Sequence, residues 1–175
     1  MSSDPAQRAA SYWEQRKREM RAFWDERRIE AAQRCDRLVE EYERAVAAGD
    51  EERAELLIDV ALWEESSPGR AALQRLLVSS GQTRHQAIVR SLQLDAHASS
   101  VPFLRRAFDE GLPRMRECSC SEPGAIAKWF GHAFADIGTP EAIAALRHYA
   151  LSHPEPDVRE EMRYRLGKLN REPDR

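Results

Sequence analysis

Residues 98–108, Ala-Ser-Ser-Val-Pro-Phe-Leu-Arg-Arg-Ala-Phe, and residues 139–149, Thr-Pro-Glu-Ala-Ile-Ala-Ala-Leu-Arg-His-Tyr, share one pattern. Each comes after a stretch with helical periodicity, residues 85–95 in the first copy and residues 124–137 in the second. A shift of 42 residues superimposes four pairs: Val101 on Ile143, Leu104 on Leu146, Arg105 on Arg147, and Arg106 on His148. Two helices per repeat and a period near forty residues are typical of helical solenoids. The sequence therefore predicts an all-α fold, a short right-handed α-solenoid of helix pairs.

The N-terminal part of the chain has a different pattern. After Pro5 there is no Gly or Pro before Gly49, which predicts one long helix, with a break near residues 27–28 as the alternative. Its apolar positions form one helical stripe: Trp13, Met20, Trp24, Ala31, Cys35, Leu38, Tyr42 and Ala45. This helix either caps the first repeat or projects as an arm that binds a partner or a second copy of the chain.

The next predicted helix, residues 51–65, is apolar over most of its circumference. Such a helix is expected to be buried between neighbours. Only a narrow window is polar, and it holds Glu52, Glu55 and Asp59 with Trp63 at its border. This acidic stripe is either a solvated helix edge or a surface that binds a partner.

Two more helices are predicted between residues 67 and 95. The second of them is the first helix of the first repeat copy. Ser67 and Pro68 are typical of a helix start, and Gly81 of a helix end. Thr83 is the expected cap of the helix over residues 85–95. The expected core positions of the latter helix are Ala87, Ile88, Val89, Leu92 and Leu94.

The two copies of the repeat differ after their second helix. In the first copy, a helix that starts at Ser100 is predicted to end at residues 111–113, Gly-Leu-Pro. Residues 112–123 then form an expected insertion, and solenoid insertions often lie on the binding face. Ser121 and Thr139 are the expected caps of the next two helices.

The expected domain organisation has three parts. Residues 1–49 form the long N-terminal helix, residues 50–170 the repeat domain, and residues 171–175 a frayed tail. The last helix, residues 157–169, is the first helix of an unfinished repeat, and its charged side chains suit a terminal cap.

The segments 136–143, Asp-Ile-Gly-Thr-Pro-Glu-Ala-Ile, and 100–106, Ser-Val-Pro-Phe-Leu-Arg-Arg, resemble HEAT-type repeats of bacterial proteins. The resemblance covers about residues 68–170. It implies a curved stack of helix pairs whose second helices line a concave, partner-binding side. The family includes scaffolds, bilin-lyase-like proteins, a group of DNA glycosylases, and small proteins that neutralise toxins encoded by neighbouring genes.

The composition bounds the class of function. The net charge is −3 at pH 7, from 27 basic and 30 acidic residues, whereas a general nucleic-acid binder is usually clearly basic. No run of about eighteen apolar residues is present, so a membrane-spanning segment is not expected. Three cysteines do not describe a disulfide framework. The expected compartment is the cytoplasm.

Motifs that carry chemistry are not found in the sequence. Cys118-Ser119-Cys120 is the most suggestive feature, with His132 in the next helix, but its spacing is shorter than zinc sites and redox pairs use. There is no Gly-rich phosphate loop and no Gly-x-Ser-x-Gly elbow. We therefore expect neither an enzyme nor a bound metal or cofactor.

The preferred interpretation is a non-enzymatic protein-binding solenoid, most specifically an immunity protein that occludes the active site of a bacterial toxin domain. The alternatives are a HEAT-repeat protein that acts on nucleic acid, and a maturation chaperone or scaffold of the bilin-lyase-like kind. The predicted binding surface lies on the second helices of the repeats: Arg105, Arg106, Glu110, Arg147 and His148. The acidic stripe of residues 51–65 is the second candidate surface.

Overall fold

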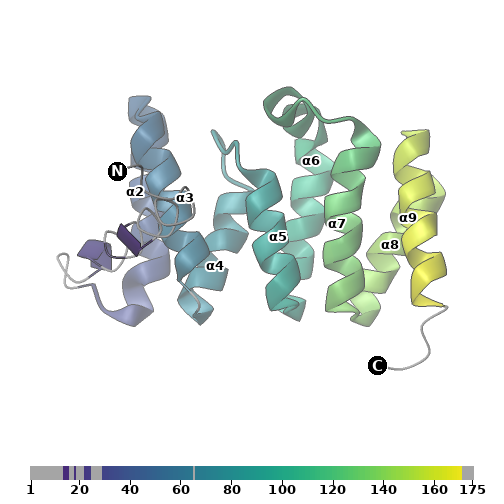
Figure 1. Cartoon of the computed structure of the whole chain (residues 1–175), viewed down its shortest axis with the longest axis horizontal. Coiled ribbons are helices and arrows are strands. Elements are labelled where there is room, and N and C mark those ends of the chain that lie inside the picture. Colours follow the sequence, from purple (N-terminus) through teal and green to yellow (C-terminus); the bar gives the residue numbers. More distant parts are fainter. Residues whose placement is uncertain (1–13, 16–17, 19–21, 25–28, 65, 171–175) are drawn as a thin grey trace, which may run out of the picture. The chain divides into compact units, whose positions relative to one another are not determined.

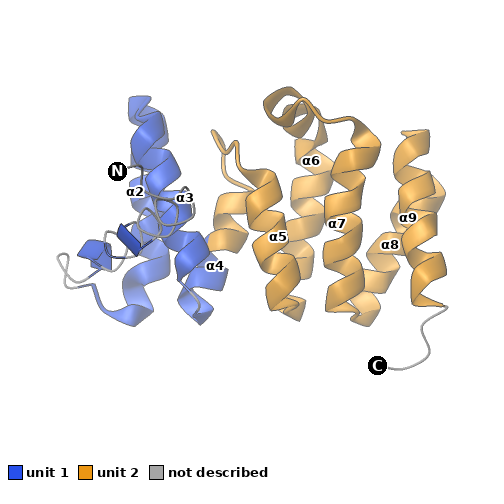
Figure 2. Cartoon of the chain, in the orientation of Figure 1, with its two compact units in different colours: residues 1–72 blue, residues 73–175 orange. Residues whose placement is uncertain are grey.

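The computed structural model describes residues 14–15, 18, 22–24, 29–64 and 66–170. Within these residues every regular element is a helix, so the prediction of an all-α fold is confirmed for the described part of the chain (Figure 1). The chain divides into two compact units, Met1–Ala72 and Leu73–Arg175 (Figure 2). The division falls inside one helix, whereas the sequence pattern predicts a boundary between residues 49 and 50.

The first unit contains η1 (Ala31–Gln33), α2 (Arg34–Ala48), α3 (Glu51–Trp63) and the start of α4 (Ser67–Leu77). Gly49 ends α2 with a φ of 70°, a left-handed conformation that suits glycine. Asp50 then caps α3, because its side chain accepts a hydrogen bond of 3.0 Å from the Arg53 backbone N–H. This short turn packs α2 against α3. Their shared core consists of Leu38, Val39, Tyr42, Leu57, Ile58, Val60 and Ala61, all buried.

The predicted N-terminal helix is not continuous. Ile29 and Glu30 are not helical, and Glu30 has a ψ of 143°. The Arg34 guanidinium lies 5.3 Å from the Trp24 ring centroid, so the two side chains meet across this interruption. In one straight helix these residues would lie about 15 Å apart along the axis. The alternative break at residues 27–28, most of the chain before Ile29 and the tail 171–175 lie outside the described residues.

The second unit contains the end of α4, then α5 (His85–Asp95), η2 (Ala98–Ser100), α6 (Val101–Ser119), α7 (Pro123–Ile137), α8 (Pro140–Ser152) and α9 (Pro156–Leu169). Helix α7 packs against both α5 and α9, while α6 and α8 lie behind them (Figure 1). The unit therefore has two layers, one of α5, α7 and α9 and one of α6 and α8. A proline in the first turn starts each helix from α6 to α9, where its missing N–H costs no hydrogen bond.

The core of the second unit is aromatic and joins the two layers. The Phe108 ring of α6 lies 4.9 Å, centroid to centroid, from both Phe130 of α7 and Tyr149 of α8. The Tyr149 hydroxyl donates a 2.8 Å hydrogen bond to the Asp109 carboxylate, which links α8 to α6. Leu104 and Leu146, which the 42-residue shift superimposes, are both fully buried. Both are therefore core positions, as the repeat register predicts.

The prediction that the helix starting at Ser100 ends at residues 111–113 is wrong, so the expected insertion at residues 112–123 is largely helical. Helix α6 continues through Pro113 to Ser119. A proline inside a helix removes one hydrogen bond and costs about 3 kcal/mol. Leu112 and Met115, on either side of it, are 9% and 1% exposed, and their burial offsets this cost. Apolar contacts therefore extend the helix past the residue that was expected to end it.

Two caps and one core position also differ from the predictions. Arg84 and Glu122, rather than Thr83 and Ser121, precede the first turns of α5 and α7, and neither side chain makes a capping hydrogen bond. Thr139 does cap α8, where its hydroxyl oxygen accepts a 3.3 Å hydrogen bond from the Ala142 N–H. Leu94 is 70% exposed because, at about 100° per residue, it lies opposite the buried Leu92.

Candidate functional site

The predicted surface on the second helices is exposed, but two of its charges are already paired with each other. The Arg106 Nε lies 3.1 Å from the Glu110 carboxylate on the same helix. Both side chains are more than half exposed, and such a surface pair contributes little to stability. Arg105 lies near the Tyr149 hydroxyl, and the His148 Nδ1 lies 3.3 Å from the Ser152 hydroxyl. This surface is therefore a set of exposed charged and polar side chains, part of which are engaged with one another.

The acidic stripe lies on α3 in the first unit. Glu52 and Glu55 are exposed, Asp59 is half-buried, and Trp63 is 39% exposed. Asp59 and Trp63 both make further interactions within the protein. The predicted placement of apolar and acidic side chains around this helix is therefore correct. The acidic side chains lie on the side opposite the buried Leu57, Ala61 and their neighbours.

A groove between α5 and α7 was not predicted. We define the α5–α7 groove by its lining residues: Gln86, Ala87, Val89, Arg90 and Gln93 of α5, and Lys128, Trp129 and His132 of α7. It holds about 1060 Å³ of open space, solvent included. At one end, the Gln93 Nε2 donates a 2.5 Å hydrogen bond to the Asp136 carboxylate and so bridges the two helices.

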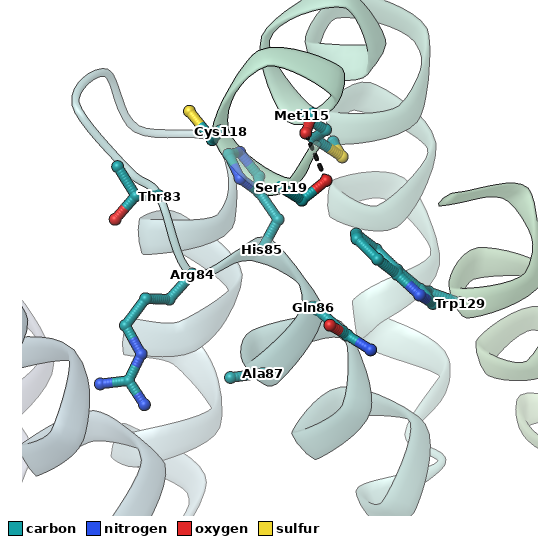
Figure 3. Close-up of a pocket in the computed structure, with 9 residues that line it drawn as sticks. All are labelled: Thr83, Arg84, His85, Gln86, Ala87, Met115, Cys118, Ser119 and Trp129. Atoms are coloured by element: carbon teal, nitrogen blue, oxygen red, sulfur yellow. Dashed lines mark hydrogen bonds between the residues drawn. The ribbon is translucent and has the colours of Figure 1, made fainter. Parts of the chain in front are cut away.

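The other end of the groove adjoins a second hollow, which we call the His85 pocket (Figure 3). Three residues, Gln86, Ala87 and Trp129, line both hollows. The remaining lining residues are Thr83, Arg84, His85, Met115, Cys118 and Ser119. The last three belong to the part of α6 beyond Pro113, so the unexpected extension of that helix builds one wall of the pocket. The Ser119 hydroxyl is turned back to donate a 2.6 Å hydrogen bond to the Met115 carbonyl.

His85 is held neutral. Its side chain is buried, and burial, together with the nearby Arg114 guanidinium, lowers its pKa to about 4. Neutral imidazole is therefore the form present at pH 7. This histidine adds no charge to the pocket.

His132, at the rim of the groove, is also shifted toward the neutral form. Burial lowers its pKa first, and the Arg165 guanidinium lowers it further, while Asp136 and Glu161 act in the opposite direction. The Arg165 Nη1 lies 3.3 Å from the His132 Nδ1, which suits a hydrogen bond from the guanidinium to a neutral imidazole. The charged side chains that line the groove are therefore Arg90 and Lys128.

We expect His85 to make the protein less stable as the pH falls. Its pKa is about 6.5 in an unfolded chain and lower in the folded one. Between these values the unfolded chain binds the proton more tightly, so acidification favours unfolding. Between about pH 7.5 and about pH 5, His85 should account for about 1–2 kcal/mol of the lost unfolding free energy. Denaturant unfolding of the wild type and of His85→Gln at both pH values measures this share, and equal pH dependence in the two proteins would contradict it.

The cysteines and histidines do not converge on a metal site in the described residues. Cys118 and Cys120 are both exposed, and Cys120 ends α6 in a left-handed conformation with a φ of 49°. Within the part of the chain that the structure describes, no group of three His, Cys, Asp or Glu side chains could hold a metal ion. Likewise, none of the described helices is long and apolar enough to cross a membrane.

The groove was missed because its residues carry no recognisable motif. Gln86, Arg90 and Gln93 are spaced four and three residues apart, so they lie on one stripe of α5. The spacing alone would have been enough to place these three side chains on one face of the helix. Which helix it faces, and whether space remains between them, depends on tertiary packing.

No family model matches this chain, and neither the curated proteins nor the solved structures contain a significant match.

Proposed function

We propose that this chain is a non-enzymatic protein-binding repeat protein, and that its second unit is a short right-handed solenoid of HEAT-like helix pairs. The pairs are α5 with α6 and α7 with α8, and α9 begins a third. Two observations support the register. Leu104 and Leu146 are both fully buried, and the residues next to them in the chain, Arg105 and Arg147, are both exposed.

The observation that carries a binding role is the α5–α7 groove. It combines an open hollow with a partly buried tryptophan and an exposed arginine, and these two residue types are enriched among the hot spots of protein interfaces. A protein of this kind acts by covering a surface of its partner. A standard interface buries about 1,600 Å² in total, which is more than the groove alone offers. Neighbouring helix faces would supply the rest.

In its most specific form, the proposal is that the chain is an immunity protein that occludes the active site of a toxin domain. The support for this form is the resemblance of residues 68–170 to HEAT-type repeats, a family that includes proteins that neutralise toxins. The acidic stripe on α3 is a second surface for such a partner, since Glu52 and Glu55 are exposed beside Trp63. Basic partner surfaces, such as those of nucleases, suit an acidic stripe electrostatically.

The proposal is tested with the protein encoded beside the gene for this chain. We expect the two purified proteins to form a stable complex in size-exclusion chromatography, and the neighbour to lose its toxic activity in that complex. A neighbour that is toxic but neither binds nor is inhibited would contradict the immunity role. A neighbour that binds without being a toxin would support a scaffold or chaperone instead.

A further inference from the structure

The α5–α7 groove is built by two facing stripes of side chains. On α5 the stripe is Gln86, Arg90 and Gln93, and on α7 it includes Lys128 and His132. The hydrogen bond from Gln93 to Asp136 closes the groove at the carboxyl ends of the two helices. At the amino ends the groove continues into the His85 pocket, because Trp129 lines both hollows. The groove is therefore elongated and open at one end to a second hollow.

The charge of the groove is positive. Arg90 and Lys128 are both exposed, and the residues lining the groove include no Asp or Glu. Among the residues that the structure describes, no carboxylate forms an ion pair with either cation. Two cations at the mouth of one groove, without an internal partner, favour a ligand that carries carboxylates.

The floor of the groove is apolar. Val89 is fully buried and lines it, and the half-buried Trp129 lines both the groove and the His85 pocket. That pocket is lined in part by the buried Met115 and by His85, which is neutral. A methionine and a tryptophan give an apolar side chain large, polarizable contact surfaces.

We propose that the α5–α7 groove binds an acidic segment of the protein partner. The segment places a carboxylate between Arg90 and Lys128 and an apolar side chain against Trp129, at the entrance of the His85 pocket. This inference rests on the proposed protein-binding function and names the chemistry of its partner. It differs from the predicted surface on the second helices, which lies on the other layer of the second unit.

The observations favour an acidic protein segment over a nucleic acid. A nucleic-acid strand needs a line of cations that continues along its backbone. On α9, the next helix of this layer, the Arg165 Nε lies 2.6 Å from the Glu161 carboxylate, so its charge is already neutralised. Asp136 lies at the closed end of the groove, bound to Gln93. The cations that line the groove and the adjoining pocket are Arg90, Lys128 and Arg84, a number that suits a segment with a few carboxylates.

The test measures binding of a short fluorescein-labelled peptide in which Glu and Leu are interspersed, by fluorescence anisotropy with the full chain. Three probes serve as comparisons: the same peptide with Lys for Glu, the same peptide with Ser for Leu, and a single-stranded oligo-dT of similar length. We expect the Glu–Leu peptide to bind most tightly, and its affinity to fall as salt is added, because exposed charges are screened. Preferential binding of the Lys peptide or of oligo-dT would overturn the proposal.

Two double variants locate the binding site. Arg90→Glu with Lys128→Glu reverses both groove cations, and we expect it to weaken Glu–Leu binding at least about tenfold. Arg44→Glu with Arg163→Glu changes the net charge by the same amount at exposed positions of α2 and α9, outside the groove and the predicted surface, and should leave the affinity unchanged. All four side chains are exposed, so both variants should keep the wild-type circular dichroism spectrum and melting temperature. Equal loss in both variants, or no loss in the groove variant, would overturn the proposal.

The outcomes separate this inference from the proposed function. If the neighbour-encoded partner binds the wild type and the groove variant equally, the protein-binding function stands and the groove assignment is wrong. If that partner does not bind but the Glu–Leu peptide does so through Arg90 and Lys128, the groove is correct and the immunity role is wrong.

Discussion

Replacing Leu104 or Leu146 by Ala is expected to lower the free energy of unfolding by about 2–5 kcal/mol in each case. Both side chains are fully buried, and the 42-residue shift superimposes Leu104 on Leu146. Truncation removes apolar contacts and leaves a cavity that the packed helices can only partly close. Because the two sites are equivalent in the repeat, we expect losses of similar size, measured by denaturant unfolding monitored by circular dichroism.

Leu94→Ala and Leu151→Ala are the matched controls. These leucines lie on helices of the same unit but are 70% and 80% exposed. Their truncation should change the unfolding free energy by no more than about 0.5 kcal/mol. Losses at Leu104 and Leu146 as small as those of the controls would show that the repeat register is wrong.

Phe108→Ala should be still more destabilising, by about 3–5 kcal/mol. The ring is fully buried and contacts residues of three other segments, since its centroid lies 4.9 Å from those of Phe130 and Tyr149 and 5.5 Å from that of His153. Its loss opens the junction between the two layers, where the edge-to-face contact with Tyr149 adds to the buried area. Denaturant unfolding of the purified variant measures the change.

Phe103→Ala is the control for Phe108, because Phe103 lies on the same helix but is only half-buried. We expect its truncation to cost clearly less. If Phe103→Ala were as destabilising as Phe108→Ala, the junction of α6, α7 and α8 would not be the centre of the core.

The helices and their register were predictable because they depend on local chemistry. Gly49 and Thr139 mark a helix end and a helix start with the φ angle and the capping bond that their residue types favour. The burial of Leu104 and Leu146 was predictable from spacing alone. These features are determined within a few residues of sequence.

The errors arose where tertiary contacts outweigh local preference. Pro113 was expected to end a helix, but the buried Leu112 and Met115 extend α6 through it. The interruption at Ile29 and Glu30 lies close to the alternative break at residues 27–28, but no Gly or Pro marks it, whereas the contact between Trp24 and Arg34 accompanies it. The α5–α7 groove was missed for the same reason, since it exists only through the spacing of two helices.

The most direct test of the groove as the binding site is amide hydrogen exchange of the full chain, alone and saturated with the Glu–Leu peptide. We predict that exchange slows in residues 84–93 and 125–132, which flank the groove and the His85 pocket, while residues 101–110 and 140–152 exchange at their original rates. Slower exchange confined to the second helices α6 and α8, or to α3, would contradict the account and place the binding surface there instead.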